Sequence, residues 1–346
     1  MSTAKEGTLE LKVAVYNMEW MVNLFTKDGQ LKTTGEDGER SGLLAEVVKA
    51  IDPDILGVVE GPDTTVSGSK TASAQMKAWA VYHGLDNSYK AVHGFPSGGR
   101  QELCALYRSD KVVLKHAPVK SKSKNPFNEP FLFDTTDTLI KEHYEHYRPP
   151  FELSVRSADS GDELARIILA HAKSKGIFDL VDMARFEQIS GRNRKKLYAE
   201  CFSIRERCDQ WLKEKPTMKI VVMGDINDGF GTDYYEQRFS RSAVEILLGD
   251  VWYPEGILKH VLPRPKMNKY GWVPSTGRFK DRLTGDTFNV LIDHMLVSQS
   301  VRVRDATVWN PYLVQKDDAT AGRVKAVRNA LLKASDHFPV SAILDF

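Results

Sequence analysis

The sequence predicts an α+β fold in which mixed β-sheets pack face to face and helices lie outside them. Apolar runs with strand character alternate along the chain with segments of helical spacing. The strand-like runs at residues 151–156 and 165–170 follow one another across a short turn, which indicates an antiparallel hairpin rather than a purely parallel sheet. With 346 residues, 42% of them hydrophobic, the chain is long enough for one large domain or two small ones.

The first third of the chain predicts alternating strands and helices. Apolar residues between positions 43 and 51 recur at helical spacing, and Asp52-Pro53 ends this helix. Residues 103–107 and 112–114 flank a polar turn and predict a hairpin. The other elements predicted here are strands at residues 11–16 and 55–59 and a helix at residues 72–82.

The rest of the chain begins with a polar stretch rich in Lys, Ser and Pro. It runs from about residue 115 to 150 and predicts an insertion or a substrate-facing loop. A long helix is predicted at about residues 191–213, and strand-like runs around Val290 and Val303 predict a further hairpin. The strands predicted in this part, besides the hairpin above, are residues 219–223, 287–297, 301–308 and 338–344.

The charge balance gives no global attraction to nucleic acid. The chain carries 48 basic and 46 acidic side chains, a formal net charge of +2. The main local candidate is the basic run Arg192-Asn193-Arg194-Lys195-Lys196, with Arg205 and Arg207 further along the same helix. The alternative is a solvent-exposed helix face, the usual place for such charge runs.

Cysteine usage and the N-terminus predict a cytoplasmic protein. Cys104, Cys201 and Cys208 do not form an even set and lack the spacing of a zinc site, which favours reduced thiols. The first residues lack the apolar core of a signal peptide. No stretch approaches the ~20 apolar residues of a membrane span.

Polar residues capable of phosphate or metal chemistry lie at the ends or in the middle of strand-like runs, which predicts one shared pocket. Hydrolysis of a phosphate ester requires a divalent cation, an activated water and a donor to the leaving oxygen. Magnesium and manganese prefer oxygen ligands, which makes Glu60 and Asp225 suitable. Asn17 and Asn227 offer amides that can hold a carboxylate, a metal or a phosphate oxygen.

His337 is the predicted general base, because an unperturbed imidazole titrates near pH ~6.5. Asp293 is the predicted carboxylate partner, whereas Asp336 would point to the other face of a strand and is better placed for a metal. Singly, each residue also has a structural interpretation, such as a turn at Gly224-Asp225-Ile226-Asn227-Asp228. The set and its order favour an active site.

The ordered set of motifs resembles the endonuclease/exonuclease/phosphatase superfamily, the group of deoxyribonuclease I, exonuclease III, sphingomyelinases and inositol phosphatases. The resemblance spans about residues 11–346. The matching segments are Tyr16-Asn17, Val59-Glu60, Ala105-Leu106-Tyr107-Arg108-Ser109, Tyr147-Arg148-Pro149-Pro150-Phe151, His171-Ala172-Lys173-Ser174, Gly224-Asp225-Ile226-Asn227, Ile292-Asp293-His294-Met295-Leu296-Val297-Ser298 and Ser335-Asp336-His337-Phe338-Pro339-Val340.

The resemblance implies a four-layered α/β/β/α sandwich of two mixed sheets with outer helices. It implies a single domain over residues 11–346, preceded by an extension at residues 1–10. The expected insertion near 115–150 is a departure that the motifs do not predict, and it could set substrate choice. It also implies a Mg²⁺ or Mn²⁺ site at one end of the sandwich. Glu60 would be the principal ligand, and His337 the base or a phosphate ligand, paired with Asp293. The residues that would complete the metal and phosphate contacts are Asn17, Asp225, Asn227 and Asp336.

His171 and His294 refine the resemblance. Deoxyribonuclease I and the sphingomyelinases carry His where this chain has His171, whereas the exonuclease III branch carries Asn, which weakens an abasic-site repair function. His171 would protonate the leaving oxygen or bind the phosphate. Its expected carboxylate partner falls at Gln101, with Glu102 beside it. His294 replaces a more common aromatic residue or Arg, and either lines the pocket or packs in the core.

These observations together predict a metal-dependent phosphoesterase, with phosphodiesters favoured over monoesters. The leading substrate class is nucleic acid, DNA or RNA, which would make the chain a nuclease contacting its substrate through Tyr107, Arg148, Lys173 and the basic run. The alternatives are a phosphatase or phosphodiesterase for a small nucleotide, a sugar phosphate or a lipid headgroup. A non-catalytic phosphate-binding module is a further alternative.

Overall fold

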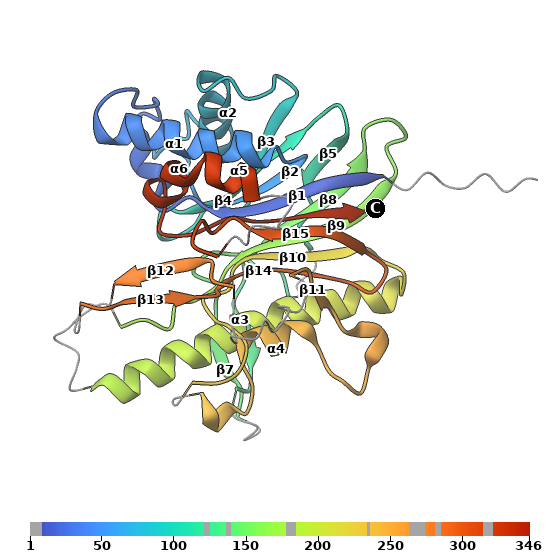
Figure 1. Ribbon diagram of the computed structural model, residues 1–346. Coiled ribbons are helices and arrows are strands. Elements are labelled where there is room, and N and C mark those ends of the chain that lie inside the picture. Colours follow the sequence, from blue (N-terminus) through green and yellow to red (C-terminus); the bar gives the residue numbers. More distant parts are fainter. Residues whose placement is uncertain are drawn as a thin grey trace, which may run out of the picture.

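The computed structural model places the chain in four layers, helices, sheet, sheet and helices (Figure 1). It describes residues 9–120, 125–135, 140–177, 185–233, 236–262, 274–280, 285–313 and 321–346. Among the described helices, none combines the length and apolar character that crossing a bilayer requires. The predicted α+β class with two mixed sheets is confirmed.

The first sheet has six strands in the order β15-β16-β1-β2-β4-β3. Its centre is mixed, because β1 runs antiparallel to β16 and parallel to β2. The strands are β1 (Glu10–Asn17), β2 (Ile55–Gly61), β3 (Tyr89–His93), β4 (Glu102–Arg108), β15 (Arg302–Val308) and β16 (Val340–Asp345).

The second sheet also has six strands, in the order β11-β14-β10-β9-β8-β5. Its central strand β10 runs parallel to β9 and antiparallel to β14. The strands are β5 (Val112–His116), β8 (Phe151–Ser157), β9 (Glu163–His171), β10 (Ile220–Asp225), β11 (Lys259–His260) and β14 (Asp293–Val297). Two small hairpins pair β6 (Phe131–Phe133) with β7 (Glu142–Tyr144), and β12 (Gly277–Lys280) with β13 (Thr287–Val290).

The helices cover the outer faces of the two sheets (Figure 1). Beside the first sheet lie α1 (Gly35–Ile51), α2 (Ala72–Tyr82), α5 (Ala321–Ala326) and α6 (Arg328–Lys333). Beside the second sheet lie α3 (Phe186–Glu214) and α4 (Ala243–Leu248). Cap residues fix some of these ends, since Thr71 Oγ1 accepts the Ala74 N–H at the start of α2 and Ser242 forms a capping box with Glu245 at the start of α4.

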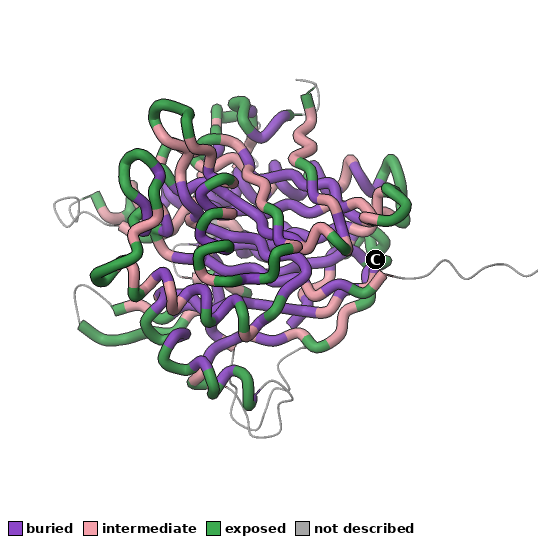
Figure 2. Tube along the Cα trace, turned by 90° about the horizontal axis from the view of Figure 1, so that it is seen from above, coloured by how far each residue is buried: buried purple, intermediate pink, exposed green. Residues whose placement is uncertain are grey.

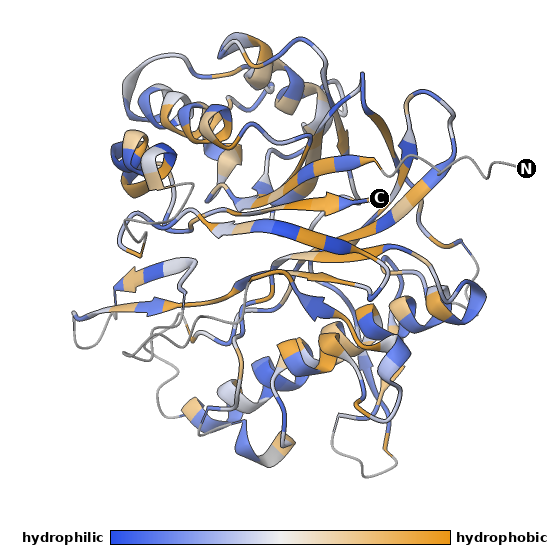
Figure 3. Ribbon diagram, turned by 45° about the vertical axis from the view of Figure 1, so that its right-hand side comes forward, coloured by the Kyte–Doolittle hydropathy of each residue, from blue (hydrophilic) through white to orange (hydrophobic). Residues whose placement is uncertain are grey.

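Apolar side chains form three cores that separate the four layers. The middle core lies between the sheets and contains residues such as Val13, Leu169 and Met223. A second core lies under α1 and α2, and a third under α3 and α4. Most residues of the central strands, such as β1, β2, β9 and β10, are therefore buried, and Figure 2 shows this buried centre. In Figure 3 apolar residues are frequent along the strands.

One hairpin prediction is confirmed and two are wrong. β8 and β9 pair antiparallel as predicted. β4 and β5, in contrast, belong to different sheets, and so do β14 and β15. Residues 108–111 therefore form a corner between the sheets, which keeps Tyr107, Val112 and Leu114 in the core between the sheets. A short polar turn between apolar runs has the same pattern in a hairpin and in such a corner, so the sequence could not distinguish them.

Other boundaries differ in detail. The predicted strand at residues 287–297 is divided, because β13 pairs with β12 and β14 enters the second sheet. The helix predicted at 72–82 has these bounds, and the long helix starts earlier, at Phe186. Within the stretch 115–150 the structure describes β6 and β7. Of the extension predicted at 1–10, residues 1–8 lie outside the described residues, and Glu10 already belongs to β1.

Candidate active site

Strand register brings polar side chains to one end of both sheets. In the second sheet Asp225 pairs with His171 of β9 and with Asp293 of β14, so the three lie side by side across neighbouring strands. In the first sheet Asn17 pairs with Val59, beside Glu60. Both sheets thus contribute side chains to one cluster, as expected where strand ends meet.

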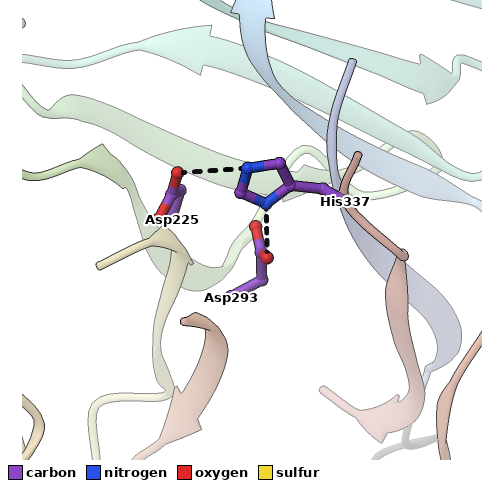
Figure 4. A group of neighbouring side chains, drawn as sticks. All are labelled: Asp225, Asp293 and His337. Atoms are coloured by element: carbon purple, nitrogen blue, oxygen red, sulfur yellow. Dashed lines mark hydrogen bonds and ion pairs between the residues drawn. The ribbon is translucent and has the colours of Figure 1, made fainter. Parts of the chain in front are cut away.

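His337 precedes β16 and is held by Asp293. Its Nδ1 lies 2.8 Å from Asp293 Oδ2, and its Nε2 lies 3.9 Å from Asp225 Oδ2 (Figure 4). Burial lowers the pKa of His337, but the carboxylates of Asp293, Asp225 and Asp336 raise it to about 10. The imidazole therefore carries a proton as long as no other positive charge neutralises these carboxylates.

Thr276 holds Asp293 from behind, and sequence reasoning missed it. Its Oγ1 accepts the backbone N–H groups of Ile292 and Asp293 at 3.1 and 2.9 Å. Among the described residues, Asp293 Oδ1 has no hydrogen-bond partner. Thr276 lies in a segment without motif or periodicity, so no sequence signal indicates this role.

Asp225 is the centre of the cluster. Its Oδ2 accepts a hydrogen bond from Asn17 Nδ2 at 3.1 Å, and its Oδ1 accepts the backbone N–H of Asn227 at 2.9 Å. Burial and the nearby Asp293 raise the pKa of Asp225 to about 7. Asn227 has a left-handed φ of 55° and its Nδ2 donates to the Ala172 carbonyl at 3.0 Å, so this side chain ties the Asp225 loop to the end of β9.

His171 lies against two carboxylates without a close hydrogen bond to either. Its Nε2 is 3.6 Å from Asp225 Oδ2 and 3.8 Å from Glu60 Oε1. Burial lowers the pKa of His171, and Arg148 and His337 lower it further, so the ring is neutral.

The side chains at the positions expected to hold the carboxylate partner of His171 have other contacts. Gln101 Oε1 accepts from Arg148 Nε at 2.9 Å, and Glu102 Oε1 accepts the Thr64 N–H at 3.0 Å. Neither side chain orients His171, and its Nδ1 has no hydrogen-bond partner among the described residues.

Glu60 and Asp336 face the cluster from the first sheet and from the segment before His337. Glu60 has a left-handed φ of 56°, and its Oε2 accepts the Trp20 N–H at 2.8 Å. Asp336 Oδ1 lies 3.7 Å from His337 Nε2. Burial raises the pKa of Asp336 to about 6, and the charges of Glu19 and Glu60 raise it too, against the lowering effect of His337.

These side chains fit a divalent cation. Asp225, Asp293 and His337 offer ligand atoms within 4.8 Å of one another. His337 Nδ1 is engaged by Asp293, and the raised pKa of the ring keeps a proton on Nε2 too, so the carboxylates are the available donors. Asp225 and Asp336 have raised pKa values, and Asp293 Oδ1 has no hydrogen-bond partner among the described residues. The site therefore carries more negative charge than its own cationic side chains neutralise. Oxygen donors of this kind suit Mg²⁺ or Mn²⁺.

The predicted substrate contacts separate into two groups. Arg148 is largely buried near Glu60 and Asp225. Burial lowers its pKa, and the charges of Glu60 and Asp225 offset only part of this effect. Lys173 follows β9 by two residues, and its N–H donates to Glu200 at 2.7 Å. Tyr107 lies elsewhere, because it pairs with Ile55 at the opposite end of β2 from Glu60. The structure does not bring Tyr107 to the site, since register places it in the core between the sheets.

Most basic side chains of this part of α3 form ion pairs with acidic residues of the same chain. Neither predicted interpretation, a nucleic-acid contact or a solvent-exposed face, included such pairs. Arg194 is buried and pairs with Asp233, and Lys195 pairs with Glu142. Arg205 and Arg207 are buried, and they pair with the half-buried Asp209 and the buried Glu152. Arg192, in contrast, is exposed.

His294 packs behind the site. Its Nδ1 lies 2.9 Å from His260 Nε2, and its Nε2 lies 2.7 Å from the Asp228 carbonyl oxygen. Phe230 covers both rings. Of the two interpretations of His294, core packing is the one that these contacts support.

No family model matches the sequence. No curated protein matches it either. Solved structures do share its fold. Truncated TDP2 from Caenorhabditis elegans superposes with a TM-score of 0.51 at 13% identity, covering 97% of this chain and 98% of that one. TDP2 from D. rerio, complexed with single strand DNA product, gives a TM-score of 0.50 at 13% identity, covering 97% of this chain and 99% of that one. At such identities the likeness concerns the fold alone.

Proposed function

We propose, from the fold this chain shares with the endonuclease/exonuclease/phosphatase superfamily and from its clustered side chains, that it is a divalent-metal-dependent phosphodiesterase. One observation carries the proposal. The Asp293–His337 pair faces Asp225 across 3.9 Å, at the edge where Glu60 and Asp336 add two further carboxylates. A base held by one carboxylate beside a cluster of oxygen donors is the arrangement that metal-assisted hydrolysis of a phosphate ester requires.

The cation would be Mg²⁺ or Mn²⁺, held by Glu60, Asn17 and Asp336 with Asp225 beside them. When bound, it would neutralise phosphate oxygens and lower the pKa of a coordinated water. Glu60 is prepared for this role because the Trp20 N–H fixes its Oε2 at 2.8 Å. Asn17 adds a neutral amide, which avoids a further like charge among the carboxylates.

His337 acts as the general base of the proposed reaction. Asp293 accepts from Nδ1, which leaves Nε2 directed toward Asp225 and Asn17. The proton on His337 is stabilised by carboxylates, so neutralising Asp225 and Asp336 lowers its pKa toward the range in which imidazole accepts a proton. In the imidazolium form the same ring would bind a phosphate oxygen, the alternative role for this residue.

His171 and Asn227 act on the phosphate or the leaving oxygen. Because burial keeps His171 neutral, it serves as a hydrogen-bond donor rather than as a strong acid. Its Nε2 points toward Asp225 and Glu60, where the phosphate would approach. Asn227 lies in the loop after Asp225, and its Nδ2 donates to the Ala172 carbonyl at 3.0 Å. The second N–H of this amide would donate to a phosphate oxygen.

We infer that the substrate is a nucleic acid strand, contacted through Arg148 and Lys173. Arg148 lies near Glu60 and Asp225, so it can meet a phosphate at the cation. The D. rerio neighbour in complex with a single strand DNA product supports this choice. A small-molecule or lipid-headgroup phosphate is the second candidate, because the net charge is only +2 and much of the α3 charge is paired internally.

The test is magnesium-dependent release of nitrophenol from a phosphodiester and a phosphomonoester reporter in parallel. We expect diester cleavage, reduced by about 10²–10⁴-fold in His337→Ala. His143→Ala is the matched control, because this histidine is exposed on β7. Monoester preference would instead indicate a phosphatase, and absence of turnover on both reporters would favour a phosphate-binding module.

A further inference from the structure

The segment Met18-Glu19-Trp20, which follows β1, carries two adjacent residues in a costly backbone conformation. Glu19 and Trp20 have φ values of 43° and 48°, the left-handed region that residues with a Cβ rarely adopt. Such conformations persist only where the surroundings hold them in place. The segment therefore requires a structural reason, and its contacts supply one.

Three polar groups of this segment contact residues of the candidate active site. The Glu19 N–H donates to Asn17 Oδ1 at 3.0 Å, and the Trp20 N–H donates to Glu60 Oε2 at 2.8 Å. Glu19 Oε2 accepts the backbone N–H of Asp336 at 3.1 Å. These contacts reach the three residues to which the proposed cation site is assigned, Asn17, Glu60 and Asp336.

One side chain from α1 holds both segments that carry these residues. Arg40 Nη1 donates to the Met18 carbonyl at 3.1 Å and to the Ala334 carbonyl at 2.9 Å, and its Nη2 donates to the Trp20 carbonyl at 3.3 Å. Ala334 lies two residues before Asp336 in the chain. The Arg40 guanidinium thus bridges the segment after β1 and the segment before β16.

The chemistry of arginine suits this role. A planar guanidinium offers five N–H donors in fixed directions, whereas a lysine ammonium is a compact charge on a flexible stem. Three carbonyls from two chain segments require such a fork. A hydrophobic side chain at position 40 would remove this donor from the Met18 and Ala334 carbonyls, whereas the Trp20 carbonyl would keep the Asn23 N–H at 2.9 Å. The link between the two segments would then be lost.

We propose that Arg40 is a positioning residue of the candidate active site, which keeps Glu60 and Asp336 directed at one cation by holding Met18–Trp20 and Ala334 together. The proposal rests on the proposed function, because the cation is part of that function. Arg40 touches neither substrate nor cation in this scheme. It acts through the Trp20 N–H on Glu60 and through the Glu19 carboxylate on Asp336.

The test measures Mn²⁺ binding without turnover, from the electron paramagnetic resonance signal of free Mn²⁺ in titrations of the full chain. We expect Arg40→Ala to bind Mn²⁺ about tenfold or more weakly than the wild type, the usual effect of removing an outer partner of a metal site. Arg156→Ala is the matched control, because its guanidinium also donates to a backbone carbonyl, Gly161, but at the β8–β9 turn. This control should bind Mn²⁺ as the wild type does.

A second readout separates positioning from general stability. Millimolar guanidinium ion, too dilute to denature, should restore Mn²⁺ binding to Arg40→Ala and leave Arg156→Ala unchanged. Arg40→Lys, which keeps the charge but not the fork, should also bind weakly, and it replaces Arg40→Ala if that variant does not fold. Thermal melts of all variants verify that they are folded.

The outcomes distinguish the two proposals. Unchanged Mn²⁺ affinity in folded Arg40→Ala and Arg40→Lys would overturn the role of Arg40 while leaving the metal-dependent function in place. Equal weakening in Arg40→Ala and Arg156→Ala would do the same, because it would indicate a general loss of stability. A wild type that binds no Mn²⁺ would overturn both proposals.

Discussion

His337 illustrates how a single residue takes its properties from distant parts of the chain. The sequence indicated Asp293 rather than the adjacent Asp336 as its partner, since neighbours in a strand point to opposite faces. In the structure Asp293 Oδ2 lies 2.8 Å from Nδ1, while Asp336 Oδ1 lies 3.7 Å from Nε2. The Asp293 contact agrees with this choice, although Asp336 and His337 precede β16 and strand alternation is not the reason for it.

A buried histidine away from the site predicts how stability depends on pH. His146 packs against Phe127 and lies 3.2 Å from Ser203 Oγ, and burial lowers its pKa to about 3. Because the unfolded chain binds this proton near pH ~6.5, the unfolded state gains protons first as pH falls, and the unfolding free energy decreases below that pH.

His146→Gln should remove this contribution. Between pH 7 and 5 the wild type should lose about 2 kcal/mol more unfolding free energy than His146→Gln, measured by urea denaturation at both pH values. His143→Gln is the control, because His143 is exposed. The unfolding free energy of this variant should depend on pH as that of the wild type does. Parallel pH profiles for wild type and His146→Gln would contradict the prediction.

Side chains at strand ends were predictable, whereas contacts made through backbone groups were not. Asn17, Glu60 and Asp225 each follow an apolar run, and that position carries the signal. Arg40 and Thr276 act on carbonyl and N–H groups, which every residue has, so no spacing reveals them. The predicted substrate contact of Tyr107 is wrong, because a sequence motif does not indicate which end of a strand its residues occupy.

At the scale of elements, the β12–β13 hairpin packs over the proposed base. Gly277 forms a bridge with His337, and the Arg278 N–H donates to the Asp336 carbonyl at 3.1 Å. The Phe279 ring lies edge-on to His337, with centroids 5.6 Å apart. The hairpin thus fixes the segment that carries the base and shields one side of its ring from water.

Phe279→Ala should lower kcat about tenfold on the diester reporter, because the imidazole loses the ring that limits its orientations. The thermal midpoint should change little, since Phe279 is only partly buried. Phe288 faces Phe279 from β13, with ring centroids 5.9 Å apart, and Phe288→Ala tests whether hairpin packing alone matters. Equal loss of kcat in both variants would mean that Phe279 has no particular contact with the base.

A buried ion pair connects α3 to the second sheet. Arg207 of α3 and Glu152 of β8 are both fully buried and hydrogen-bonded to each other. Arg207 Nη2 also donates to the Asn125 carbonyl at 2.9 Å. This pairing explains why the charge on α3, predicted as a nucleic-acid contact or an exposed face, has a largely structural use.

Arg207→Met should reduce the unfolding free energy by about 3–5 kcal/mol, because it leaves the Glu152 carboxylate buried without its partner. The double variant Arg207→Met/Glu152→Met should recover part of that loss, since no unpaired charge remains. Arg192→Met, an exposed position on the same helix, should stay within about 0.5 kcal/mol of the wild type. Urea denaturation measures all three, and a double variant less stable than the single one would refute the argument.

At the scale of the molecule, the predicted fold of two mixed sheets with outer helices is confirmed, although neighbouring strands were assigned to one sheet where they belong to two. The order of the motifs is still informative after such errors, because the motif residues lie at strand ends that meet at the site, whichever sheet each strand belongs to. Sheet membership depends on long-range pairing, such as β5 with β8, that local patterns do not encode. The fold class, and the meeting of Asn17, Glu60 and Asp225 at one end of the sheets, were therefore easier to predict than connectivity.

The candidate site exists only when the two sheets are packed, because Asn17 and Glu60 come from the first sheet and Asp225, His171 and Asp293 from the second. A cation that binds this site stabilises the folded state and has no comparable site in the unfolded chain. Saturating Mn²⁺ at about 100 times its dissociation constant should add about 2.7 kcal/mol to the unfolding free energy.

That stabilisation should fall in Glu60→Gln at the same Mn²⁺ concentration, because the neutral amide is a poorer ligand than the carboxylate. Thermal melts over a Mn²⁺ titration measure it, and chelator should return the wild type to its metal-free midpoint. Glu46→Gln, an exposed change on α1 that alters the net charge equally, should shift with Mn²⁺ as the wild type does. If Glu60→Gln gained as much as Glu46→Gln, the cation would bind elsewhere and Glu60 would not be among its ligands.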